Sequence, residues 1–269
     1  MDITVQGHAA FAATGGRPFD PTLPAVIFVH GAGLDHTVWA LQTRYFANHG
    51  RAVLAVDLPG HGRSAGPALT TIEALGTWLL DLIAAAGATR AALVGHSMGA
   101  IAALEAAAQA ANHMPGRAAA IDRLALLGMA ARMTVHPTLL AAAAAGDRRA
   151  LDMMIGWGLG RRAQMGGHVA PGLWVASGSL RLLERGAAEI LSTDLAACNA
   201  YERGLAAAAA VACPTLVLVG ESDRMTPAKS AAEFVRQMKD ARSVVLKRAG
   251  HLMMIEQPDD TLDALVRFV

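Results

Sequence analysis

The sequence predicts an α/β protein with a central, mostly parallel sheet, helices on both faces of that sheet, and an inserted all-helical cap. Three observations predict this class. Apolar runs of strand length alternate with helical stretches in both halves of the chain. From about residue 130 to residue 212 the strand signals disappear, and helical runs replace them. The chain has 269 residues, which is enough for one large domain with a sizeable insertion.

In the first half, strands and helices follow each other in single units. Residues Ile3–Val5 and Ala9–Ala13 predict a short opening hairpin before the turn at 14–16. A continuous apolar run is typical of a parallel strand buried on both faces. Such runs predict strands over Ala25–Val29, Ala52–Val56, Ala91–Val94 and Leu124–Leu127. Between these strands, helices are predicted over Thr37–Asn48, Thr71–Ala86 and Met98–Ala111.

The second half begins with helices alone and then returns to alternation. Helical runs cover Leu139–Ala145, Arg148–Ile155, Leu180–Ile190 and Leu195–Ala210. After these come a strand over Thr215–Val219, a helix over Ala228–Met238, a strand over Ser243–Leu246 and a last helix from Asp259. We therefore expect residues 1–131 and 211–269 to form the core and residues 132–210 to form the cap.

Composition and charge exclude several classes of protein. Apolar residues make up 54% and charged residues 17%, which excludes a disordered chain. The formal net charge is +1, with acidic and basic residues interspersed, so nothing favours a nucleic acid or an anionic membrane as partner. The first residues lack the pattern of an export signal, and the most apolar stretch, 205–220, is too short to span a membrane and contains Pro214.

The two cysteines, Cys198 and Cys213, cannot form a disulfide framework and lack metal-ligand spacing. We expect a cytoplasmic protein without cofactor or metal. The oligomeric state, monomer or homodimer, stays open.

The segment Gly95-His96-Ser97-Met98-Gly99 fits the pattern G-x-S-x-G between a predicted strand and a predicted helix. A serine on such a sharp turn is lifted clear of the sheet, and small residues two before and two after it let strand and helix approach. The helix that starts there also directs its N-terminal N–H groups towards developing negative charge. Ser97 is therefore the candidate nucleophile.

A serine nucleophile needs a base, usually histidine, and an acid that orients the base. His251 follows the strand Ser243–Leu246, at the carboxyl edge of the sheet, and is the candidate base. Asp223 follows the strand Thr215–Val219 and is the candidate acid, with Glu221 as a distant second. The other histidines considered fall in a hairpin, a helix end or a loop, or point away from the serine: His8, His49, His113, His136 and His96.

Attack on a carbonyl creates an oxyanion, which must be met by N–H donors. The backbone N–H of Met98, next to the nucleophile, is one expected donor. The second is expected from the loop His30-Gly31-Ala32-Gly33 after the first parallel strand, with Ala32 as our choice. That loop lacks both G-x-G-x-x-G and a P-loop lysine, which argues against nucleotide binding.

Together these residues resemble the α/β-hydrolase fold family over nearly the whole chain. The order nucleophile, acid, histidine is the family's order, and the segment 57–64, Asp-Leu-Pro-Gly-His-Gly-Arg-Ser, looks like the turn after its fourth strand. The resemblance implies a structural role for that turn, so Asp57, His61 and Ser64 are not placed in the triad. It also implies neither epoxide hydrolase nor haloalkane dehalogenase activity, because those relatives carry aspartate at the position of Ser97.

The resemblance implies that the cap selects the substrate, which we expect to be a small or medium apolar acyl compound. The tentative pocket residues are Leu34, Met129, Met153, Trp157, Trp174 and Leu252. We expect hydrolysis of a carboxylic ester. Two alternatives stay open: cleavage of an activated carbon–carbon bond in a ring-fission product, and a non-catalytic relative that binds ligands. The carbon–carbon alternative is disfavoured because Gly33 is followed directly by Leu34, without the longer Gly- and Ser-rich loop usual in such relatives.

Overall fold

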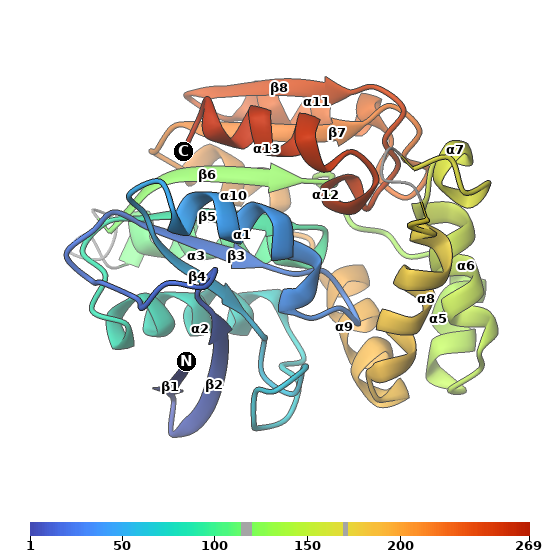
Figure 1. Cartoon of the computed structure of the whole chain (residues 1–269), viewed down its shortest axis with the longest axis horizontal. Coiled ribbons are helices and arrows are strands. Elements are labelled where there is room, and N and C mark those ends of the chain that lie inside the picture. Colours follow the sequence, from blue (N-terminus) through green and yellow to red (C-terminus); the bar gives the residue numbers. More distant parts are fainter. Residues whose placement is uncertain (114–119, 169–171) are drawn as a thin grey trace.

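The computed structural model describes residues 1–113, 120–168 and 172–269. In these residues an eight-stranded sheet runs through the molecule in the order β1-β2-β4-β3-β5-β6-β7-β8 (Figure 1). The strands are β1 (Asp2–Val5), β2 (His8–Ala13), β3 (Ala25–Val29), β4 (Ala52–Val56), β5 (Ala91–His96), β6 (Ile121–Leu127), β7 (Thr215–Gly220) and β8 (Ala241–Leu246).

The sheet is parallel from β4 across to β8. β1 pairs antiparallel with β2, and β2 pairs antiparallel with β4. The opening hairpin turns at Gln6 and Gly7, both of which have positive φ. β6 pairs directly with β7, although residues 128–214 lie between them in the sequence. The predicted α/β class is confirmed.

Alternate residues of the central strands serve two separate cores. Ile27 and Val29 pack with α2 (Ile72–Ala85) and α3 (Met98–His113). Phe28 faces the other side, where its ring lies 5.2 Å from Trp39 and 5.9 Å from Phe46. That side is covered by η1 (His36–Trp39), α1 (Ala40–Ala47), α12 (Met253–Glu256) and α13 (Pro258–Val266). Burial on both faces explains why these strands read as unbroken apolar runs.

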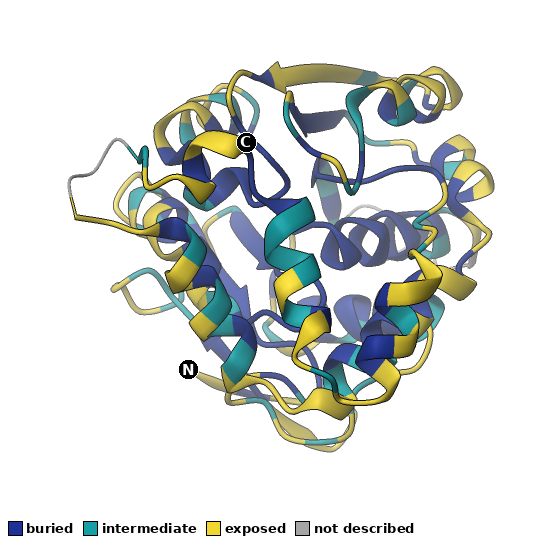
Figure 2. Ribbon diagram, turned by 90° about the vertical axis from the view of Figure 1, so that its right-hand side faces the viewer, coloured by how far each residue is buried: buried dark blue, intermediate teal, exposed yellow. Residues whose placement is uncertain are grey.

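Of the helices between β6 and β7, all but the last lie beyond one end of the sheet, at the right of Figure 1. In chain order, the helices between these two strands are α5 (Pro137–Ala144), α6 (Arg149–Gly158), α7 (Arg161–Gln164), α8 (Val175–Arg185), α9 (Ala188–Ala200) and α10 (Gly204–Ala210). Figure 2 views this end, where exposed and half-buried helices stand in front of buried strands. α10 falls in the range assigned to the cap, yet it packs chiefly on α3 and on α11 (Ala228–Gln237).

Two predicted helices are each divided in the structure. The run Leu180–Ile190 breaks at Gly186, whose backbone is extended. The run Leu195–Ala210 breaks at Tyr201, which is also extended, and resumes at Gly204. Gly204 lies so close to the Ala131 carbonyl that a Cβ would overlap it. A glycine lies at or near each break, Gly186 in the first run and Gly204 in the second, and glycine is a poor helix former. In the described ranges, no helix has both the length and the apolar character needed to cross a bilayer.

Candidate active site

Ser97 lies at the sharp turn between β5 and α3. Its φ is +52°, in the left-handed region that residues other than glycine rarely adopt. Gly95 lies against the Gly99 backbone, and Gly99 lies against the His30 carbonyl, both so closely that a Cβ would overlap. The Ser97 N–H donates to the Leu127 carbonyl at 2.8 Å, which ties the turn to β6. The side chain is thereby held at the carboxyl edge of the sheet.

Asp223 and His251 meet at the same edge, in the loops that follow β7 and β8. His251 Nδ1 lies 2.8 Å from Asp223 Oδ2, and both residues are buried. Since an ionised carboxylate only accepts hydrogen bonds, the proton lies on Nδ1 and leaves Nε2 as the basic nitrogen.

The surroundings of Asp223 keep its carboxyl group ionised. Its Oδ1 accepts the N–H groups of Met225 and Thr226 at 2.8 and 2.9 Å, and its Oδ2 accepts the Thr226 hydroxyl at 2.6 Å. Burial alone would raise the pKa of Asp223, but the nearby His251 ring and these donors hold that pKa well below its usual value. Thr226 was not foreseen from the sequence, although a hydroxyl three residues after a candidate acid is a usable signal.

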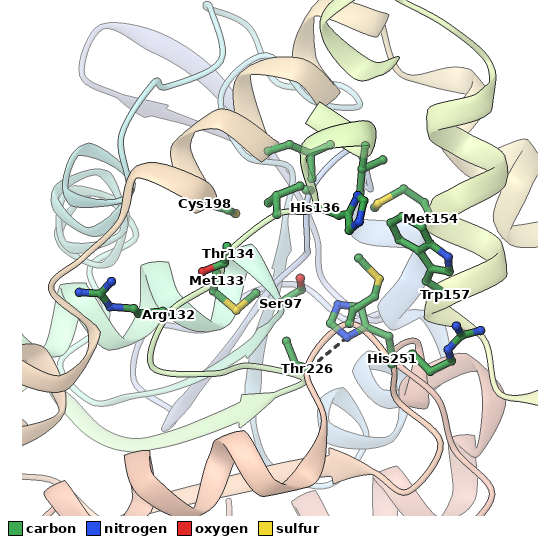
Figure 3. Close-up of a pocket in the computed structure, with 16 residues that line it drawn as sticks. Ser97, Arg132, Met133, Thr134, His136, Met154, Trp157, Cys198, Thr226 and His251 are labelled. Atoms are coloured by element: carbon green, nitrogen blue, oxygen red, sulfur yellow. Dashed lines mark hydrogen bonds between the residues drawn. The ribbon is translucent and has the colours of Figure 1, made fainter. Parts of the chain in front are cut away.

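A cavity of about 420 Å³ brings Ser97 and His251 together under the inserted helices (Figure 3). Met154 and Trp157 of α6 line it, as do Leu195 and Cys198 of α9. The other lining residues are Ala32, Arg132, Met133, Thr134, Val135, His136, Leu139, Arg224, Met225, Thr226 and His251. Most of this surface is apolar, as is usual for a small-molecule site.

In the described part of the chain, two backbone N–H groups near Ser97 have no acceptor. The Ala32 N–H has no acceptor among the described residues, and Ala32 lines the cavity. Met98 is the first residue of α3, where an N–H has no acceptor within its own helix. Both are the donors that the sequence singled out for an oxyanion.

Two neighbouring histidines, His30 and His96, are buried and make hydrogen bonds that support the backbone around the site. His30 faces the Gly31 carbonyl through Nδ1 and accepts the Leu58 N–H through Nε2; burial lowers its pKa to about 4. His96 donates through Nε2 to the His251 carbonyl at 2.9 Å, and burial keeps its pKa well below the usual value. Both rings are therefore neutral, and His96 supports the backbone of His251.

Glu256, which the sequence did not single out, holds the loop that carries His251. Its Oε1 accepts the Gly250 N–H at 3.1 Å, and its Oε2 accepts the Gly160 N–H at 2.8 Å. Burial raises the pKa of Glu256 to about 7. Glu221, by contrast, is exposed and accepts the Arg248 N–H, away from His251.

Of the six tentative pocket residues, only Trp157 lines the cavity that contains Ser97. Met153 lines a neighbouring cavity, and its place is taken by Met154. Leu34, Met129 and Leu252 are buried in the two cores, and Trp174 is 60% exposed at the start of α8. Both Met153 and Met154 have helical spacing to Trp157, so periodicity could not distinguish them.

Asp35, His36 and Asp57 form the one cluster in the described residues whose ligand atoms lie close enough to hold a metal ion. These groups already have partners. Asp57 Oδ1 accepts the His36 N–H and lies 2.8 Å from His36 Nδ1, and Asp35 Oδ1 accepts the Thr37 N–H and hydroxyl. We therefore assign these three residues a structural role in the turn around residue 57 and do not assign them a metal ion.

Comparison with known proteins finds that the chain is similar to hydrolases. The model of the alpha/beta hydrolase family matches residues 26–264. A crystal structure of the enol-lactonase from Burkholderia xenovorans LB400 is similar, with a TM-score of 0.84, 26% identity, and coverage of 100% of this chain and 99% of that one.

Two curated proteins are similar along most of their length. Pimeloyl-[acyl-carrier protein] methyl ester esterase of Aeromonas hydrophila is 27% identical, over 91% of this chain and 95% of its own. 3-Oxoadipate enol-lactonase 1 of Acinetobacter baylyi is 25% identical, over 91% of this chain and 88% of its own.

Proposed function

The chain belongs to the alpha/beta hydrolase family, and from this premise we propose that it hydrolyses a small carboxylic ester through an acyl-enzyme on Ser97. The observation that carries the proposal is one cavity that contains both Ser97, on its strained turn, and His251, paired with the buried Asp223. We assign the roles of nucleophile, base and orienting acid to these three residues.

The proposed reaction follows from the protonation states. His251 Nε2 accepts the hydroxyl proton as Ser97 Oγ attacks the carbonyl carbon, and the carbonyl oxygen becomes an oxyanion that faces the N–H groups of Ala32 and Met98. When the carbon–oxygen bond to the alcohol breaks, His251 gives its proton to the departing alcohol. Water then attacks the acyl-enzyme, with His251 again as base, and releases the acid and free Ser97.

Ester hydrolysis is preferred to carbon–carbon cleavage because of the relatives that align along most of the chain. Among them are an esterase and two enol-lactonases, whose names specify acyl carbon–oxygen bonds. A ring-fission hydrolase of Metapseudomonas resinovorans aligns over only 22% of this chain. We keep carbon–carbon cleavage as the second candidate, and binding without catalysis as the third.

We further propose that the inserted helices act as the substrate-selecting cap over a core formed by the rest of the chain. The residues they contribute to the cavity support this role, namely Leu139, Met154, Trp157, Leu195 and Cys198. Because α10 packs with the core helices, the cap would comprise α5 to α9. The free, unpaired sulfurs of Cys198 and Cys213 support a reducing compartment such as the cytoplasm, which fractionation of expressing cells would test.

The charges around the cavity refine the expected substrate. Arg132 and Arg224 line it, neither has an ion-pair partner among the described residues, and no carboxylate lies in the lining. We therefore expect esters with a carboxylate on the acyl chain to have a lower KM than neutral esters of equal length. This preference should weaken with salt and with Arg224→Gln. An equal KM for both kinds of ester would contradict the expected preference for a negatively charged acyl group.

The deciding experiment compares p-nitrophenyl esters of increasing acyl length with a ring-fission dienone, using wild type and Ser97→Ala. Turnover of an ester that is lost in Ser97→Ala supports the proposal, as does labelling of Ser97 by a fluorophosphonate. Cleavage of the dienone alone would assign the carbon–carbon class. Ligand binding without turnover of either compound would assign the third candidate, and a label on another residue would contradict the role of Ser97.

A further inference from the structure

A buried ion pair joins the inserted helices to the core near Ser97. His61 Nε2 lies 2.8 Å from Asp194 Oδ2, and the side chains are 3% and 2% exposed. Asp194 belongs to α9, whereas His61 belongs to the turn after β4. The pair belongs to neither the proposed triad nor the cavity lining, so its role needs a separate explanation.

The same carboxylate oxygen holds the loop that carries the candidate oxyanion donor. Asp194 Oδ2 accepts the Gly33 N–H at 2.8 Å. The Leu34 N–H donates to the Gly31 carbonyl at 3.2 Å, which closes a four-residue turn with Ala32 and Gly33 in its middle. The two central N–H groups of such a turn point outward. Asp194 takes that of Gly33, so the Ala32 N–H is the one left without an acceptor.

The ion pair also neutralises the charge of the Asp194 carboxylate, which accepts the Gly33 N–H. Both His61 nitrogens face acceptors, Nε2 towards Asp194 and Nδ1 towards the Pro59 carbonyl at 3.0 Å, so the ring carries both protons. An unpaired carboxylate near Ser97 would oppose the negative charge that develops on the substrate. With His61 protonated, Asp194 can hold Gly33 without adding a net charge to the site.

α9 connects this contact to the substrate cavity. Leu195 and Cys198, one and four residues after Asp194, line the cavity on the same helix. Arg185, at the end of α8, makes a second ion pair with Asp35 of the same loop. A shift of the helix would therefore move the cavity wall and the loop together.

We propose that Asp194, paired with His61, is a positioning residue: it holds the turn Gly31–Leu34 so that the Ala32 N–H faces the oxyanion, and it thereby makes the oxyanion hole depend on the placement of α9. This inference rests on the proposed ester hydrolysis. Asp194 acts through the loop and does not touch the reacting atoms.

The first test uses substitutions that differ in hydrogen-bonding ability. Asp194→Ala removes the acceptor, and we expect kcat to fall about 10- to 100-fold with little change in KM, below the 10²–10³-fold loss for a missing oxyanion donor. Asp194→Asn keeps a carbonyl oxygen for the Gly33 N–H and should restore kcat to within a few-fold of wild type. Glu189→Gln is the matched control, because it removes an exposed carboxylate from the same helix.

A second readout separates positioning from general destabilisation. A boronic acid that forms a tetrahedral adduct with serine should bind Asp194→Ala more weakly by the same factor as the loss in kcat/KM, whereas the carboxylic acid product should bind equally well. The concentration of active sites is measured by phosphonate titration, so that unfolded protein is not counted in the enzyme concentration from which kcat is calculated. Unchanged kcat and unchanged boronate affinity in Asp194→Ala would overturn the proposal.

The third test needs no variant. The Gly33 amide of wild type should exchange its hydrogen slowly although it lies in a loop, and Asp194→Asn should retain part of this protection. Rapid exchange in wild type would overturn the proposal even if Asp194→Ala fails to fold. Ser97→Ala, assayed in parallel, tests the proposed function separately: its full activity would contradict ester hydrolysis on Ser97, while the exchange result would still decide the role of Asp194.

Discussion

Asp223 is surrounded by four hydrogen-bond donors, and this determines what its substitution does. In Asp223→Asn the amide would favour the wrong tautomer of His251, so we expect kcat to fall by about 10⁴ while the fold is retained. Ester turnover and thermal unfolding are measured together. Glu221→Gln, which removes the rival acid, should keep full activity. Loss of activity in Glu221→Gln, with Asp223→Asn still active, would transfer the role to Glu221.

Glycine at position 99 is required by contact with the backbone of the neighbouring strand. Gly99→Ala would place a Cβ against the His30 carbonyl, so we expect the free energy of unfolding to fall by about 1–3 kcal/mol and activity to be lost. Gly156→Ala is the control. Gly156 lies in α6 with open space around it, so alanine should stabilise by about 0.5–1 kcal/mol. Urea unfolding of both variants checks this, and equal effects would contradict the steric argument.

Individual residues of the site differ in how far the sequence predicts them. Residues at strand ends, such as Ser97, Asp223 and His251, can be proposed because parallel strands deliver their carboxyl ends to one edge. Asp194 and His61 could not be paired, because their contact depends on how α9 settles against the turn after β4. The role of these buried partners comes from tertiary packing and leaves no spacing pattern.

Two tryptophans of the inserted helices differ in exposure. Trp157 of α6 lines the cavity, whereas Trp174, at the start of α8, is exposed to solvent. Trp157→Ala should enlarge the cavity and move the preferred p-nitrophenyl ester towards longer acyl chains, with a higher kcat/KM for them. Trp174→Ala removes the same type of side chain from an exposed position and should leave the preference unchanged. An identical chain-length profile in Trp157→Ala and wild type would show that this wall does not select the acyl chain.

The contact between α9 and the turn after β4 predicts a pH-dependent stability. Burial alone would lower the pKa of His61, but the hydrogen bond and charge of Asp194 raise it above the ordinary 6.5. His30, with its ring 4.9 Å away, and Asp57 also act on His61. A raised histidine pKa stabilises the fold fully below pH 6.5, and this contribution is lost as the pH rises through the folded-state pKa.

Urea unfolding of wild type and Asp194→Asn between pH 6 and 9 measures this contribution. The difference between the two proteins should decrease with rising pH, by about 1.4 kcal/mol for each unit by which the pKa is raised. Arg185→Gln breaks the other contact with the loop and is the control, because that contact contains no histidine. A pH-independent difference for Asp194→Asn would contradict a protonated His61.

The positions of most elements follow from sequence, and their ends do not. Continuous apolar runs identify β3 to β7 because both faces of each strand are covered. The breaks at Gly186 and Tyr201 divide runs made mostly of good helix formers, with a glycine at or near each break, and α12 is too short to show a period. At Tyr201 the end of the helix also serves a tertiary contact, because the Tyr201 hydroxyl donates to Glu105 of α3 at 2.7 Å.

At the scale of the whole molecule, the direct pairing of β6 with β7 makes the intervening chain an exchangeable part. The register of the sheet is set by the strands themselves, and the entropy of closing a loop rises only slowly with its length. A chimera that carries the α5–α9 segment of another protein should therefore still form the sheet. Its kcat would approach that of the wild type only if the graft also supplies a hydrogen-bond acceptor opposite the Gly33 N–H. This requirement gives protein engineers a design criterion for transplanting new specificities.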